Sequence, residues 1–229
     1  MKTWTRFGFE FLSIFIAVIA AFALDNWNDN RKERLAESKI LAEIHHGLEK
    51  DLEDINTNIF GHEEGLKSIR YFKNLLAGQA VAEDSVMQHY LNLTRDFVSI
   101  QNTSGYETLK SRGLELIDND SLRTRIISLY EYDYTTLKKL EEEYYELQFQ
   151  ANYFESINSY IAPHFRFDEQ KNFVGIQTPL GLPEKDEKML LSYLWKISVN
   201  RNFILRYYRI VKMKIEAIQN EIAQEIDAS

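Results

Sequence analysis

The chain has 229 residues, with 27 Lys plus Arg against 35 Asp plus Glu, a net charge of -8, and no Cys. This balance argues against nucleic acid as a partner, because affinity for a phosphate backbone comes mainly from Lys and Arg. The lack of Cys excludes disulfides, thiolate metal sites and cysteine nucleophiles. With 14 Phe, 13 Tyr and 45% hydrophobic residues, the chain has enough core material to exclude wholesale disorder.

Residues 7–24 form one long apolar run, FGFEFLSIFIAVIAAFAL, in which Glu10 is the only ionisable group. Eighteen helical residues span about 27 Å, which matches the hydrocarbon core of a bilayer. Trp4 and Trp27 flank the run at the positions of interfacial aromatic anchors. The pattern predicts a transmembrane helix over residues 8–24, with the lipid bilayer as its partner.

The charges on either side of this helix indicate its orientation. Lys2 and Arg6 adjoin the apolar run directly, whereas Asp25 and Asp29 separate the later basic residues from it. Long domains translocate with little regard to charge. We therefore expect a short cytoplasmic tail, residues 1–7, and an extracytoplasmic helical domain, residues 25–229.

A cleaved signal peptide is the competing interpretation of the same run. Lys2 and Arg6 make a basic start, residues 11–20 make an apolar centre, and residues 21–23 read Ala-Phe-Ala, which is typical of a cleavage site. Glu10 beside the apolar centre argues against this interpretation.

Two features of the predicted transmembrane helix are candidates for function. Ser13, Ala17 and Ala21 form a small-xxx-small stripe, which favours close approach of a second helix, although alanine is also simply common in such segments. Glu10 is an intramembrane ionisable candidate, because a buried acid is costly unless it pairs, protonates or faces water. The alternative to a functional role is a structural one, in which the Glu10 carboxylate reaches water near the helix end or pairs with Arg6.

The remaining chain is predicted to consist of long helices. All three prolines fall within residues 163–183, which indicates a loop over residues 163–184. Apolar spacing predicts long helices at about residues 26–77, 121–162 and 185–227, the second with a slip of register near Asp133. Two short helices and an extended link at residues 97–100 are expected between the first two.

The last helix carries the clearest pattern, a heptad seam held for more than four heptads. Such a seam predicts a coiled-coil-like partner helix, from this chain or from a second copy. Its midpoint, Arg201, is expected to need an acidic or a solvent partner. The seam residues are Leu190, Leu194, Ile197, Arg201, Ile204, Tyr208, Val211, Ile215, Ile218 and Ile222.

Enzyme motifs are absent from the sequence. It contains no nucleophile elbow, Walker loop, dinucleotide fingerprint or HExxH pair. The acidic run at residues 141–143 is interpreted as a solvated face, and the tyrosines as core and rim of a bundle. We therefore predict no catalytic residue, no cofactor and no metal site.

Two stretches resemble a bacterial membrane-protein family catalogued as domain of unknown function family 6090: EFLSIFIAVIAAFALDNWNDNRKER, residues 10–34, and GYETLKSRGLELIDNDSLR, residues 105–123. In that family a glutamate opens the apolar segment and Asn-Trp-Asn closes it, as Glu10 and residues 26–28 do here. This chain has Phe9 where the family usually has Gly. The resemblance implies a single-pass bacterial inner-membrane protein with an external helical region, and it implies no activity.

The expected fold class is all-α: a single N-terminal transmembrane helix that continues into a long-helix bundle with coiled-coil-like packing. The leading functional expectation is a membrane-anchored scaffold or interaction protein, either a homo-oligomer or part of a larger membrane complex. One alternative is an oligomeric ion channel or proton-linked subunit that uses Glu10. A weaker alternative is an extracytoplasmic ligand sensor built on Phe165, Phe167 and Phe173.

Overall fold

The computed structural model describes the backbone of residues 2–228 and the side chains of residues 11–227. The described chain is mostly helical with one short hairpin, and its longest element is a helix whose N-terminal part is apolar. In chain order the elements are α1 (Lys2–Leu76), η1 (Glu83–Ser85), α2 (Val86–Leu93), α3 (Ser104–Arg112), η2 (Leu114–Leu116), α4 (Asp120–Ile127), η3 (Ser128–Tyr134), α5 (Thr135–Glu142), η4 (Tyr145–Leu147), α6 (Phe149–Ile161), η5 (Ala162–His164), β1 (Phe165–Phe167), β2 (Phe173–Ile176) and α7 (Glu184–Ala228).

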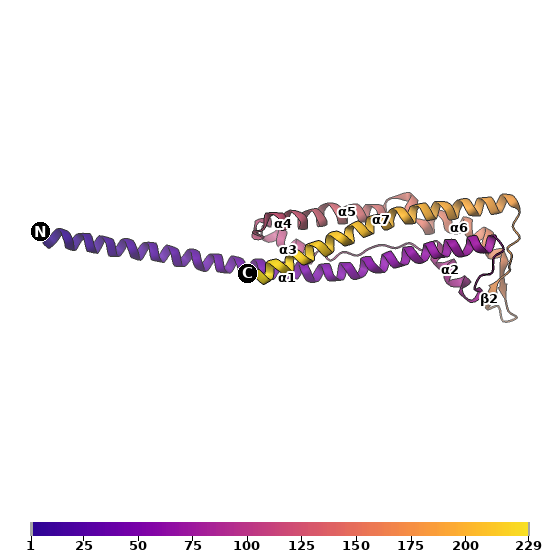
Figure 1. Cartoon of the computed structure of the whole chain (residues 1–229), viewed down its shortest axis with the longest axis horizontal. Helices are drawn as coiled ribbons and strands as arrows, with labels where there is room; N and C mark the ends of the chain where they lie inside the picture. Colours follow the sequence, from indigo (N-terminus) through magenta and orange to yellow (C-terminus); the bar gives the residue numbers. More distant parts are fainter. Residues whose placement is uncertain (1, 229) are drawn as a thin grey trace.

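Helix α1 runs unbroken for 75 residues, which corresponds to about 110 Å. Its first part projects from the bundle as a lone helix, and the rest forms one wall of it (Figure 1). Gly61 and Gly65 do not break α1. A Cβ atom at these positions would lie 2.2 Å from the Phe97 ring and 2.5 Å from the Arg201 side chain. These two glycines therefore allow other segments to approach the helix closely.

The bundle has an up, down, up, down path. Helix α1 leads away from the N-terminal end, and the chain returns through α2, an extended link at residues 94–103, and α3 (Figure 1). Helices α4 to α6 lead outward again, and α7 returns along α1, with its end beside the start of the bundle. The second of these four passes is therefore partly an extended segment. It has no neighbouring strand to form hydrogen bonds with its backbone.

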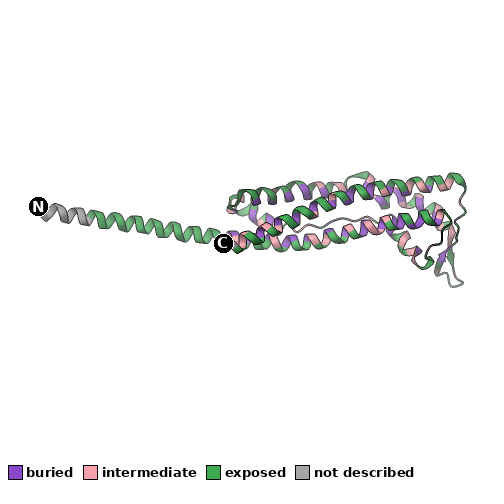
Figure 2. Ribbon diagram, viewed as in Figure 1, coloured by how far each residue is buried: buried purple, intermediate pink, exposed green. Residues whose placement is uncertain are grey.

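All ten seam residues of α7 are buried. They pack mainly on α1, and also on α4, η3, α5, η4 and α6 of the same chain. Figure 2 shows these buried positions on the inner sides of the helices, with exposed positions outside. The partner of the seam is therefore the chain itself, which leaves self-association to other surfaces.

The prediction of one continuous helix over residues 121–162 is wrong. A π-helical segment, Ser128–Tyr134, lies where the register slips, and the helix stops at Glu142. Tyr144 is extended, with φ -77° and ψ 103°, before α6 begins. The break is stabilised from outside, because the Asp96 carboxylate accepts hydrogen bonds from the N–H groups of Phe149 and Gln150 at the start of α6.

The predicted loop over residues 163–184 contains the one described sheet. Strands β1 and β2 pair antiparallel, with Phe165 opposite Ile176 and an irregularity between Arg166 and Phe167. Three and four residues are too few for the alternation that identifies a strand in sequence. The hairpin lies at the end of the bundle far from the N-terminus (Figure 1).

Candidate functional site

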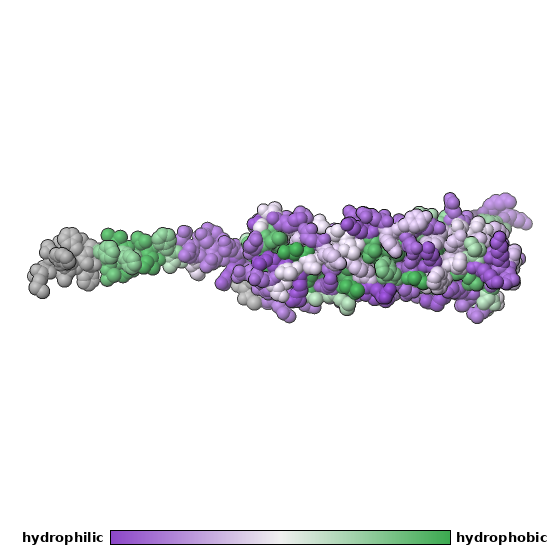
Figure 3. All heavy atoms as spheres, turned by 90° about the horizontal axis from the view of Figure 1, so that it is seen from above, coloured by the Kyte–Doolittle hydropathy of each residue, from purple (hydrophilic) through white to green (hydrophobic). Residues whose placement is uncertain are grey.

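The apolar part of α1 stands outside the bundle. Every residue from 11 to 35 is exposed, and the apolar part is followed by a hydrophilic stretch before the bundle begins (Figure 3). The described chain has one helix long and apolar enough to cross a membrane, a criterion that a signal sequence also meets. Trp27 is 62% exposed, whereas Trp4 and Glu10 lie outside the described side chains.

The small stripe of this segment points away from the bundle. Residues 18 apart on an α-helix point the same way, because 18 residues make five turns. Ala17 is thus aligned with Leu35, and Leu24 with Phe60, and all four are exposed. Ile44, on the opposite face, is fully buried. The bundle therefore covers one side of α1 and leaves the side that carries Ser13, Ala17 and Ala21 open.

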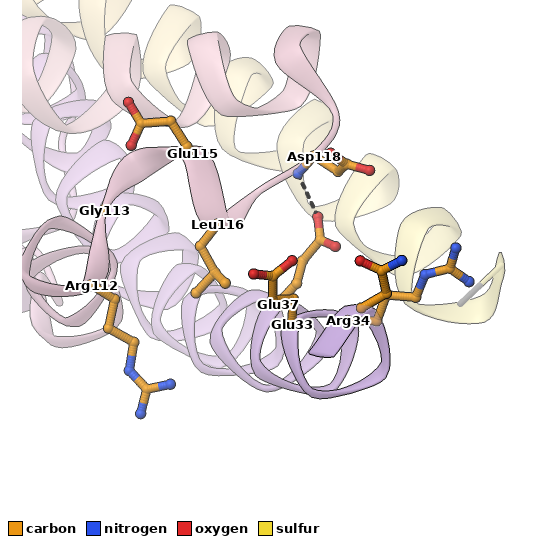
Figure 4. Close-up of a pocket in the computed structure, with 9 residues that line it drawn as sticks. Glu33, Arg34, Glu37, Arg112, Gly113, Glu115, Leu116 and Asp118 are labelled. Atoms are coloured by element: carbon orange, nitrogen blue, oxygen red, sulfur yellow. Dashed lines mark hydrogen bonds between the residues drawn. The ribbon is translucent and has the colours of Figure 1, made fainter. Parts of the chain in front are cut away.

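A cleft of about 470 Å³ lies at the base of the bundle, between α1 and η2. Figure 4 shows Glu33 and Glu37 of α1 projecting into it, while the Arg34 side chain extends toward the end of α7. One Glu37 oxygen accepts a hydrogen bond from the Asp118 N–H at 2.8 Å, and burial raises the pKa of Glu37. Within the described residues, no three His, Asp or Glu side chains are grouped to hold a metal.

Arg201 lies at the centre of the bundle and is fully buried. Its Nη2 donates to the carbonyl oxygens of Asn92, Leu93 and Arg95 at 3.2, 3.1 and 2.9 Å. Its guanidinium carbon lies 4.3 Å from the centre of the Phe149 ring. The direct hydrogen-bond partners of Arg201 are therefore backbone carbonyls at the end of α2 and just beyond it. The expected acid acts only through its charge, since the Asp96 carboxylate stabilises the charged form of Arg201.

His62 is the second polar partner of Arg201. The Arg201 Nη1 lies 2.9 Å from the His62 Nδ1, and burial, followed by the nearby guanidinium, lowers the pKa of His62 to about 3. The imidazole is therefore neutral at physiological pH, and its Nδ1 accepts the hydrogen bond. The ring is enclosed by Phe97 and Tyr208, whose centroids lie 5.0 and 5.5 Å away.

Carboxylates bind the extended link along its length. Glu141 accepts from the Ser99 N–H at 3.1 Å and from its hydroxyl at 2.8 Å, and it also accepts from the Tyr208 hydroxyl. Asp54 accepts from the Ile100 N–H at 2.9 Å. The interpretation of residues 141–143 as one solvated face is therefore wrong for Glu141, which is 6% exposed. These acids supply the acceptors that a neighbouring strand would otherwise supply.

Asp51 is the most perturbed of these acids. It is 1% exposed and accepts from the Asn102 N–H at 2.6 Å and from the Tyr134 hydroxyl at 2.6 Å. Burial raises the pKa of Asp51 to about 6, although both hydrogen bonds oppose the rise. Asp51 was not among the residues predicted to be functional. Its position three residues after Leu48 places both side chains on the same buried face of α1.

The aromatic residues of the hairpin are mostly structural. Phe165 packs edge-on against Tyr90 and Phe173, with ring centroids 5.0 and 5.2 Å away. Phe167 is 57% exposed, and both Phe165 and Phe173 pack on the core. One ring of the three is therefore presented to solvent, so they do not enclose a ligand cavity together.

Comparison of the chain with protein-family models, with curated proteins and with solved structures finds no match. The resemblance to the uncharacterised bacterial membrane-protein family therefore stays a prediction. The functional proposal rests on the geometry of the chain itself.

Replacement of Arg201 by leucine is expected to lower the free energy of unfolding by about 3 kcal/mol, because three carbonyls and His62 lose a buried donor. Denaturant unfolding of the purified full chain, followed by circular dichroism, measures this. Arg206→Leu, at an exposed position of the same helix, is the matched control and should change stability by less than about 0.5 kcal/mol. Equal effects of the two substitutions would contradict the role given to Arg201.

The pKa of Asp51 gives a pH dependence with a definite sign. Because its folded pKa of about 6 exceeds the unfolded value near 3.9, its stabilising contribution is complete below about pH 4 and is lost as pH rises through 6. Asp51→Asn is therefore expected to gain stability relative to the wild type between pH 4 and pH 7. Unfolding midpoints across this range measure the difference, with exposed Glu53→Gln as the control. A difference between Asp51→Asn and the wild type that does not change with pH would refute the assignment.

Proposed function

We propose that the protein is a single-pass, membrane-anchored helical scaffold or interaction protein that has no catalytic activity and associates with itself through its anchor. One observation carries the proposal. Residues 11–24 are apolar except for Ser13, all of them are exposed, and they belong to the same unbroken helix that forms a wall of the bundle. Exposed apolar surface of this length is costly in water and favourable in a bilayer.

The proposed placement is a bacterial inner membrane, with residues 1–7 in the cytoplasm and residues 25–229 outside it. In this placement the domain is held upright on α1, and the hairpin lies farthest from the membrane. A tail of seven residues is too short for an output of its own, so the external helices would make the functional contacts. A larger membrane complex is the class of partner that this arrangement suits.

The open face of α1 supports self-association. Copies anchored in one bilayer are parallel, and the stripe of Ser13, Ala17 and Ala21 points away from each copy's own bundle. Two anchors can therefore approach closely while both bundles lie on the outside, without a clash between them. The buried seam of α7 takes no part in this contact, because its own chain already covers it.

The alternative of an ion pathway or proton-linked subunit stays a prediction, since the side chain of Glu10 is outside the described part. The sensor alternative is weakened, because two of its three phenylalanines pack on the core of the domain.

Membrane insertion is tested by alkaline carbonate extraction of the full chain from its native membrane. The protein should remain in the pellet with its N-terminal segment intact. The double substitution Ile16→Asp and Ile19→Asp, which adds several kcal/mol to the cost of insertion, should move it to the supernatant. A mature chain that starts near Leu24, or a wild type recovered in the supernatant, would show that the anchor does not exist.

Self-association is tested by cysteine cross-linking, for which the Cys-free chain needs no other change. Ala17→Cys in native membranes should form a disulfide-linked dimer on mild oxidation. Ile19→Cys, which points about 160° away on the same helix, is the matched control and should stay monomeric. Similar dimer yields for both variants, or none for Ala17→Cys, would exclude this face as the contact.

A further inference from the structure

A second cleft of about 470 Å³ lies where the end of α7 meets α1, just beyond the apolar segment. Two guanidinium groups, those of Arg31 and Arg34, contribute to its wall. The Arg31 guanidinium carbon lies 5.9 Å from the centre of the Trp27 ring. The lining residues are Trp27, Asn30, Arg31, Arg34, Leu35, Ser38 and Ile226.

The charges around α1 are sorted by face at this height. Asp25, Asp29 and Glu33 follow one another at intervals of four and share one side of the helix. Arg31 points about 160° away from Asp29, and Arg34 points about 100° away from Glu33. Arg34 also lines the first cleft, where its charge acts against the rise in the pKa of Glu37. Among the described residues neither arginine forms an ion pair within 4 Å, whereas Lys32 pairs with Asp29 at 2.9 Å. Arg34 extends away from Glu33 and Glu37, toward the end of α7 (Figure 4). The cleft thus holds two cations without a carboxylate bound to either.

The cleft begins within a lipid headgroup layer and extends beyond it. Trp27, Arg31 and Arg34 lie about 5, 10 and 15 Å beyond Leu24 along the helix, and the headgroup region is about 5–8 Å thick on each side of the hydrocarbon core. Trp27 is therefore within this layer, and the two arginines start above it. Side chains on a helix lean toward its N-terminus. Here that direction is toward the bilayer, so both arginines lean toward the phosphate level.

We propose that Arg31 and Arg34, beside Trp27, bind the phosphate of an anionic phospholipid in the leaflet next to the domain. Guanidinium groups suit this ligand, since they bind phosphate oxygens bidentately, and Trp27 is at the depth where indole rings prefer to lie. This inference rests on the proposed transmembrane placement of residues 8–24. The bound lipid would fix the rotation of α1 about its own axis and the height of the bundle.

The test titrates the full chain in detergent micelles with phosphatidylglycerol, phosphatidylcholine or inorganic phosphate, and counts bound ligands by native mass spectrometry. The wild type should bind phosphatidylglycerol more tightly than the other two. Loss of both charges in Arg31→Gln with Arg34→Gln should weaken this binding by roughly thirtyfold, from the usual contribution of a basic residue near an anionic surface. The control, Lys32→Gln with Lys39→Gln, changes the net charge equally and should bind as the wild type does.

Three results would overturn the proposal. If phosphatidylcholine binds as tightly as phosphatidylglycerol, the site has no headgroup preference. If inorganic phosphate binds as tightly as phosphatidylglycerol, the site is one for a free anion. If both double variants lose the same affinity for phosphatidylglycerol, the effect is one of net charge. Circular dichroism of each variant shows that it is folded. Carbonate extraction separates the two hypotheses: a chain retained in the membrane without lipid preference contradicts this site alone, whereas a chain released contradicts the anchor.

Discussion

The structure depends on satisfying the backbone of an extended segment inside a bundle of helices. Residues 94–103 have no neighbouring strand, and an unpaired buried N–H or C=O group costs as much as a lost hydrogen bond. Asp51, Asp54 and Glu141 reach this link from two helices and accept its N–H groups. At its start, Arg201 donates to three carbonyls. Several of the buried polar residues therefore serve the backbone of one non-helical segment.

The same requirement explains why α1 and α7 pack with polar residues at their contact. Arg201 needs space beside α1, and Gly65 provides it, because a Cβ there would lie 2.5 Å from the Arg201 side chain. Gly61 likewise leaves space for the Phe97 ring, because a Cβ atom there would lie 2.2 Å from it. His62, between the two glycines, stays neutral and accepts from Arg201. One short stretch of α1 therefore fits both the link and α7.

Periodicity predicted the long helices well, because α1 and α7 carry apolar residues at intervals of three and four over their length. It failed where polar residues occupy the buried positions. Asp51, Asn58 and His62 are buried, whereas their apolar neighbours Leu52 and Ile59 are only partly buried. The break after Glu142 was missed because its stabilising acid, Asp96, is 53 residues away from Phe149. The stripe of small residues at Ser13, Ala17 and Ala21 was visible in the sequence, but its direction relative to the bundle required the fold.

Because α1 is continuous, a tilt of its N-terminal part also moves the far end of the bundle. From Leu24 to Leu76 the helix extends about 78 Å, and transmembrane helices tilt by about 20° on average. A tilt of that size, carried through a straight rod, displaces the hairpin sideways by about 27 Å. In the proposed placement, a small change in bilayer thickness would therefore swing the far end of the domain through a distance comparable to the diameter of a neighbouring protein.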